Sequence, residues 1–69
     1  MKNNNEITEE FSVKLKQARK DAGLSQGGMA ERMMISKRTI EKWETGERTP
    51  PSYVQRFVLN ELKLLAALK

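Results

Sequence analysis

The sequence predicts an all-α fold in which four or five helices pack into one compact domain. Apolar residues recur at spacings of three and four, which is the period of a helix, and no segment alternates apolar with polar residues as a half-buried strand does. Glycines and a proline pair separate the apolar stretches. A chain of 69 residues has room for one small core, which the helices must share.

The first helix is expected to begin at Thr8, whose hydroxyl can cap a helix N-terminus, and to stop at Gly23. Residues 1–7 are rich in asparagine and are expected to form a disordered lead-in, which leaves residues 8–69 as a single domain. One face of this helix carries apolar residues at spacings of four, three and four: Phe11, Leu15, Ala18 and Ala22.

Two short helices are expected next, capped by Ser25 and Ser36. Ala30 falls where these helices cross, and a larger side chain there would overpack the crossing. The second of them is expected to end at Thr45-Gly46. The residues expected to face inward are Met29, Ala30 and Met33 in the first helix and Ile40 and Trp43 in the second.

A last helix is expected after the loop that contains Pro50 and Pro51, because two consecutive prolines cannot continue a helix. Ser52 is expected to cap it, and its periodicity continues to about Leu68. The residues that give this periodicity are Tyr53, Val54, Phe57, Val58, Glu61, Leu62, Leu65 and Leu68.

The charge balance favours a polyanionic partner such as nucleic acid. Thirteen lysines and arginines face nine aspartates and glutamates, a net charge of +4, and three of the nine acidic residues lie within the first ten positions. The chain has no cysteine and no histidine, which excludes disulfides and thiolate metal sites and removes the usual general base and zinc ligand. We therefore expect no metal, no cofactor, no small-molecule ligand and no enzymatic activity.

A membrane location is not expected. No apolar run approaches the roughly 18 residues needed to span a bilayer. The polar N-terminus lacks the apolar core of a signal peptide. The sequence favours a cytoplasmic protein associated with the nucleoid.

The helix over residues 36–44 has the residues needed to enter a DNA groove, because it opens with a hydroxyl cap and two cations, Ser36-Lys37-Arg38. Arg38 is the first candidate for a bidentate contact to guanine O6 and N7, and Lys37 and Lys42 can reach a base edge or a flanking phosphate. Glu41 can accept a hydrogen bond from cytosine N4, but a solvated bridge to Lys37 is favoured.

Polar residues that flank this helix are candidates for contacts to the phosphate backbone. They lie at its cap, at its end, in the following loop and at the start of the last helix. Arg48 has the alternative of being an unengaged surface arginine. The candidates are Ser36, Thr45, Arg48, Thr49, Ser52 and Tyr53.

Residues 15–46 resemble the helix-turn-helix of the phage-repressor and Cro-like family, often called the xenobiotic-response-element family. The loop of basic residue, threonine and proline after Gly46 also matches that family. The resemblance implies a lambda-repressor-like fold and binding to double-stranded DNA. It is carried by Leu15, Arg19, Gly23-Leu24-Ser25-Gln26, Met29-Ala30, Met33, Ile35-Ser36, Ile40, Trp43-Glu44 and Gly46.

The same resemblance implies roles for particular residues. Gln26 matches the family's phosphate-contacting glutamine at the start of the second helix. Arg19 and Glu44 match a pair of positions that form an ion pair behind the recognition helix. The positions that match the family's base-facing and groove-lining sites are Lys37, Arg38, Thr39 and Lys42.

Two features depart from the family pattern. Gly27-Gly28 stands where the family has helix-forming residues, and a tolerated weak helix end is favoured over a role in admitting phosphate. Met34 stands where the family has glycine in the turn, because the backbone there often has a positive φ. Either Met34 adopts a left-handed conformation at a cost, or the turn has another shape.

The end of the last helix is apolar nearly all round, so it should bury more than one side. We expect a homodimer that binds a near-palindromic operator with half-sites one helical turn apart. The alternatives are a different protein partner, such as a toxin, and simple exposure of the leucines. The residues expected on this dimer or partner surface are Leu62, Leu64, Leu65 and Leu68.

Taken together, these features favour a sequence-specific, DNA-binding transcriptional regulator, and a repressor of the phage or antitoxin type in particular. The alternative is a protein-interaction module that keeps the fold but binds a toxin or polymerase. RNA binding is weaker still, because no pair of aromatic residues is placed to stack bases.

Overall fold

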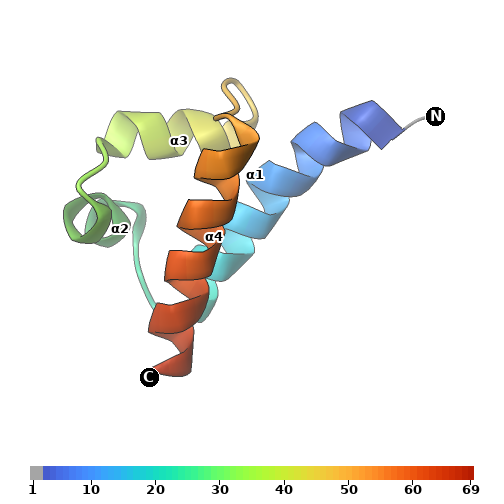
Figure 1. The fold of residues 1–69 in the computed structure, drawn as a ribbon. Helices are drawn as coiled ribbons and strands as arrows, with labels where there is room; N and C mark the ends of the chain where they lie inside the picture. Colours follow the sequence, from blue (N-terminus) through green and yellow to red (C-terminus); the bar gives the residue numbers. More distant parts are fainter. Residues whose placement is uncertain (1–2) are drawn as a thin grey trace.

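The described residues fold into four helices and contain no strand, which confirms the all-α prediction. The computed structural model describes the backbone of residues 3–69 and the side chains of residues 11–69. Figure 1 shows α1 and α4 crossing side by side, with α3 lying across one end of α4 and α2 set to one side. No helix in the described part of the chain is long and apolar enough to cross a membrane. The four helices are α1 (Asn3–Asp21), α2 (Gln26–Met33), α3 (Lys37–Thr45) and α4 (Ser52–Ala67).

The beginnings of α1 and α4 differ from the sequence-based expectations. Helix α1 begins at Asn3 rather than Thr8, so residues 3–7 of the expected lead-in are helical, and residues 1–2 lie outside the described residues. Asparagine disfavours a helix only weakly, and a helix already fixed by packing can extend through it. Helix α4 has Pro51 rather than Ser52 at its N-cap, and no side chain caps it. A proline preceding the helix fixes the backbone without a hydroxyl cap.

Two serines cap the central helices as expected. The Ser25 hydroxyl accepts a hydrogen bond from the amide of Gly28 at 2.9 Å, and the Ser36 hydroxyl accepts one from the amide of Thr39 at 3.1 Å. Helix α2 runs through both Gly27 and Gly28, so its weak helix formers do not delay its start. The cap bond contributes about 1 kcal/mol, which offsets much of the glycine cost.

The core lies between α1, α3 and α4 and receives Met29 from α2. The ring of Phe11 meets that of Trp43 edge-on, with centroids 6.2 Å apart. Ala30 is half-buried against this core, as its small size at the helix crossing predicts. Leu62 is fully buried, so it packs inside the domain and is not part of a dimer surface. The buried apolar residues are Phe11, Leu15, Ala22, Met29, Ile40, Val58 and Leu62.

Met34 takes the left-handed conformation that glycine adopts without cost. Its φ is 59° and its ψ is 41°, and its side chain is 90% exposed. Gly23 and Gly46, with φ of 75° and 83°, end the helices α1 and α3 in the same region. The turn between α2 and α3 therefore keeps the shape that the family pattern predicts, with a methionine strained to fit it.

We expect Met34→Gly to stabilise the protein by about 1 kcal/mol, because it removes the left-handed strain and loses almost no packing. Chemical denaturation with circular dichroism measures the change in the free energy of unfolding. Met34→Ala is the matched control, since alanine shortens the side chain but keeps the strain. A glycine variant no more stable than the alanine variant would contradict the expectation.

Candidate nucleic-acid interface

Helix α3 is fixed on its inner side and open on its outer side. Ile40 is fully buried and Trp43 is half-buried against the core, which sets the rotation of the helix about its axis. Lys37 and Arg38, in its first turn, are exposed. The packing that buries one face of α3 therefore presents the opposite face, with its cations, to solvent.

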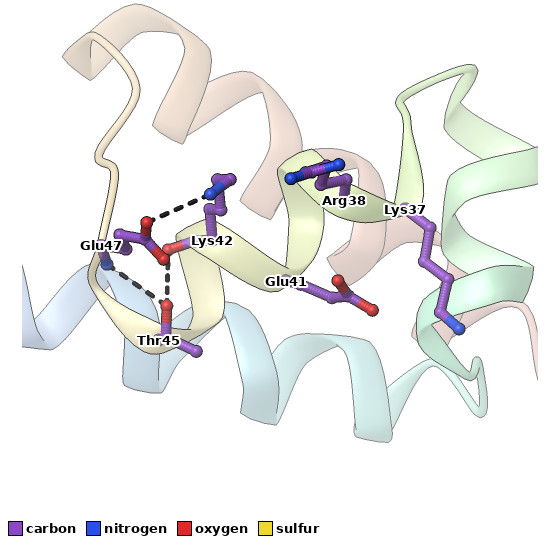
Figure 2. A pocket seen from close by; sticks show the side chains of 6 residues that line it. All are labelled: Lys37, Arg38, Glu41, Lys42, Thr45 and Glu47. Atoms are coloured by element: carbon purple, nitrogen blue, oxygen red, sulfur yellow. Dashed lines mark hydrogen bonds and ion pairs between the residues drawn. The ribbon is translucent and has the colours of Figure 1, made fainter.

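An open groove runs along this outer face (Figure 2) and is lined by residues of α3 and of the loop that follows it. Arg38 and Lys42 lie on one side of the helix, and Lys37 and Glu41 lie on the other. This set, which we call the groove surface, contains three cations and two carboxylates. Its residues are Lys37, Arg38, Glu41, Lys42, Thr45 and Glu47.

A second groove adjoins the first, because Arg38 and Lys42 line both. It lies between α3 and the loop before α4. Two residues expected to contact phosphates, Ser36 at the helix cap and Thr49 in the loop, line it together with side chains of α3. Its residues are Ser36, Arg38, Thr39, Lys42, Trp43, Arg48, Thr49, Pro50, Pro51 and Val54. The two adjoining grooves therefore contain all four expected base-facing residues. They also contain four of the expected phosphate contacts: Ser36, Thr45, Arg48 and Thr49.

Arg19 and Glu44 form an ion pair beneath this surface. Arg19 Nε lies 2.7 Å from Glu44 Oε2, and Arg19 Nη2 donates to Glu44 Oε1 at 3.1 Å, so the contact is bidentate. Arg19 Nη1 also donates to the carbonyl of Leu24 at 2.9 Å. Only 12% of the arginine side chain and 3% of the glutamate side chain are exposed. The pair links α1, the start of the helix-turn-helix and the end of α3.

The surroundings of Glu44 keep it charged. Burial raises the pKa of its carboxyl, but hydrogen bonds from Arg19 and Gln26 and the charges of Arg19 and Lys16 oppose this effect, and the net pKa lies below the ordinary 4.5. The pKa of Arg19 is raised, chiefly because its guanidinium donates to Glu44. Both groups are therefore ionised at neutral pH.

Gln26 faces the ion pair in the free protein. Its amide nitrogen donates to Glu44 Oε1 at 3.0 Å, so the half-buried side chain is held against the ion pair. Ser36 and Thr45 are engaged as well: the Ser36 hydroxyl caps α3, and the Thr45 hydroxyl donates to the carbonyl of Lys42 at 3.1 Å. The other phosphate candidates, Arg48, Thr49, Ser52 and Tyr53, are exposed in the loop and at the start of α4.

Glu47 is a member of the groove surface that sequence reasoning missed. Its Oε2 lies 3.1 Å from Lys42 Nζ. The two residues are five positions apart, beyond the three- and four-residue spacings that pair side chains on a helix. The left-handed Gly46 folds the chain back, and the amide of Arg48 then donates to the carbonyl of Lys42 at 3.2 Å. Gly46 at the end of α3 was the sequence feature that could have indicated this reversal of the chain.

Glu41 and Lys37 do not form the surface bridge that their spacing favours. Within the described residues the structure records no ion pair between them, although both border the same groove (Figure 2). The carboxylate of Glu41 therefore stays exposed on the groove surface.

Helices α2 and α3 form a two-helix motif that packs on a small helical core, and the second helix has a capped start and exposed cations. These features define a helix-turn-helix DNA-binding domain. Comparison with protein families agrees, since a family model described as "Helix-turn-helix" matches residues 15–55. The chain belongs to this family, of the Cro and repressor type, and is a DNA-binding transcriptional regulator. Comparisons with curated proteins and with solved structures give no match.

Proposed function

We propose that this protein is a sequence-specific repressor of the phage or antitoxin type that inserts α3 into the major groove of its operator. The observation that carries the proposal is the first turn of α3, where Lys37 and Arg38 are exposed beyond a hydroxyl-capped helix start while Ile40 and Trp43 anchor the opposite face. A bound repressor of this kind acts by occupying its operator in the cytoplasm, at the nucleoid.

The two adjoining grooves support separate roles for base-contacting and phosphate-contacting residues. Arg38 reads a guanine, and Lys37, Thr39 and Lys42 contact neighbouring bases or lie against the groove wall. Arg48, Thr49 and Ser52 are exposed where the phosphate strand beside the groove would pass, and Tyr53 can offer its hydroxyl there while its ring contributes to a dimer contact. Ser36, Thr45 and Gln26 offer backbone amides or side chains at the edges of this surface. Of these, Gln26 gives one hydrogen of its amide group to Glu44, and its second hydrogen can donate to a phosphate.

Selection from random duplex DNA with the purified protein, at two salt concentrations, tests the proposal. We expect an enriched motif with two-fold symmetry and half-sites one helical turn apart, about 34 Å. Weak binding without a motif, which falls steeply as salt rises, would reduce the contact to an electrostatic one and would contradict sequence-specific repression.

The exposed apolar face of α4 supports a homodimer. Leu64 and Leu68 are exposed, whereas Leu62 is in the core and Leu65 packs half-buried against it. Tyr53 and Phe57 are also exposed. At 3.6 residues per turn, positions 53, 57, 64 and 68 fall on one side of the helix. We call Tyr53, Phe57, Leu64 and Leu68 the α4 stripe.

The α4 stripe is complementary to a second copy of itself. Its four positions are symmetric about the middle of the helix, so two copies packed antiparallel bring Tyr53 of one beside Leu68 of the other and Phe57 beside Leu64. A two-fold interface requires such self-complementarity. Each contact pairs an aromatic ring with an aliphatic side chain, which suits burial of both.

We expect Leu64→Lys to weaken dimerisation about tenfold or more, because it places an unpaired charge inside the contact. Sedimentation of wild type and variant over a range of concentrations measures the change. Val13→Lys is the matched control, since Val13 is 64% exposed and Leu64 is 61% exposed, but Val13 lies on α1. A wild-type protein that stays monomeric would leave the α4 stripe to a different protein partner, such as a toxin. Equal effects of the two lysines would contradict the interface.

A further inference from the structure

We propose that Glu47 is a specificity-determining residue of the DNA-binding surface. In the free protein its carboxylate holds the ammonium group of Lys42, and it keeps that group from phosphates on duplexes that lack the matching bases. This inference rests on the proposed DNA-reading function, and it assigns to an acidic residue a role in rejecting wrong sequences.

The position of Glu47 is set by the backbone. Its amide donates to Thr45 Oγ1 at 3.3 Å, and the same hydroxyl donates to the carbonyl of Lys42 at 3.1 Å. The amide of Arg48 donates to that carbonyl as well. These bonds fix the loop against the end of α3, so the carboxylate meets Lys42 Nζ at 3.1 Å while both side chains keep solvent access, 30% for Lys42 and 63% for Glu47.

The charge on the groove surface makes this pair consequential. Three cations and two carboxylates leave a net charge of +1, and closing the Lys42–Glu47 pair leaves Lys37 and Arg38 as the cations that face an approaching duplex with Glu41. A carboxylate near DNA repels every phosphate, whatever the sequence. It becomes favourable only where a base donates a hydrogen bond to it, as the amino groups of cytosine and adenine do in the major groove.

An exchange of partners follows from this geometry. On a matched site, Lys42 donates to a base acceptor such as guanine O6 or N7, and Glu47 accepts from an amino group or remains hydrated. An exposed ion pair is weak, so a correct base can replace it. On an unmatched duplex, moving Lys42 to a phosphate leaves Glu47 unpaired beside the DNA backbone, and this repulsion offsets the new contact, so Lys42 contributes little to non-specific binding. Glu47 thus acts as a repulsive element that separates the two affinities.

Glu47→Gln tests the proposal, because it removes the charge and keeps the size. The probes are a duplex enriched in the selection and a random-sequence duplex of equal length, each titrated at several salt concentrations. We expect the variant to bind the random duplex about three to ten times more tightly, with a salt dependence steeper by about 0.9 in log–log slope per chain, the value for one added phosphate contact. The enriched duplex should gain less, so the specificity ratio falls.

Two controls separate the pair from charge alone. Glu31→Gln makes the same change at an exposed glutamate of α2 and should shift both affinities less than Glu47→Gln does. In a Lys42→Gln background, Glu47→Gln should have no greater effect than Glu31→Gln. Equal effects of the two glutamine variants, or an undiminished effect without Lys42, would overturn the inference. If wild-type protein selects no motif, the proposed function fails and this inference with it; if it selects one, these comparisons judge Glu47 alone.

Discussion

Replacing Glu44 with alanine is expected to destabilise the protein by about 3–5 kcal/mol. The substitution removes the carboxylate that pairs with Arg19, whose side chain is only 12% exposed in the wild-type protein, and it removes the acceptor for Gln26. A chain of this length has a free energy of unfolding of about 3–10 kcal/mol. The loss is therefore a large fraction of the total stability, and urea denaturation of both proteins measures the difference.

Two further variants test whether the lost stability comes from the ion pair. Glu41→Ala removes an exposed glutamate from the same helix and should change stability by less than about 0.5 kcal/mol. Arg19→Met combined with Glu44→Leu replaces both charges with apolar groups and should recover most of the loss, because no charge is then buried alone. A Glu44→Ala loss as small as that of Glu41→Ala would contradict the expectation.

The same pair gives the protein a pH dependence with a definite sign. Because the pKa of Glu44 is lower in the folded chain than its ordinary 4.5, the pair's contribution is fully present above pH 4.5. It is lost as the pH falls through the folded-state pKa. The stability difference between wild type and Glu44→Gln should therefore shrink in acid below that point, and urea denaturation at a series of pH values measures it.

The local rules of helix formation predicted most of the fold. Serine caps, the glycine stops and the spacing of apolar residues located α2 and α3, because these signals act within a few residues of one another. The predicted start of α1 was wrong by five residues. The weak helix preference of asparagine does not decide where a helix begins when packing further along the helix stabilises it. Leu62 was misplaced because a helix that is apolar all round does not reveal which side meets the core.

The part of the groove surface that lies on α3 was predictable from the sequence. The part formed by the loop after Gly46 was less so. The cations of α3 follow from its cap and its buried face. The contact of Gln26 with Glu44 and that of Glu47 with Lys42 depend on tertiary placement and on the fold-back at Gly46, which no single-helix spacing describes. These two contacts change how the surface works, because they engage groups that the sequence alone presents as available to DNA.

Arg38→Ala is expected to weaken binding to the enriched operator by about 1–3 kcal/mol for each half-site and to relax the preference at one base pair there. Arg38 is exposed in the first turn of α3 and lines both grooves, and it lies on the same side of the helix as Lys42 (Figure 2). A guanidinium in that position has the fork geometry needed to donate to guanine O6 and N7 together. Binding to a random duplex should fall much less.

Arg38→Lys separates base recognition from charge. Lysine keeps the positive charge and so retains attraction to phosphates, but it lacks the planar pair of donors. We expect this variant to bind the random duplex nearly as wild type does and to lose most of the preference for guanine on the enriched operator. Titration of both duplexes at one salt concentration measures the two effects. If lysine restores operator binding fully, or if alanine weakens both duplexes equally, Arg38 contacts the phosphate backbone, and base recognition falls to Lys37 and Lys42.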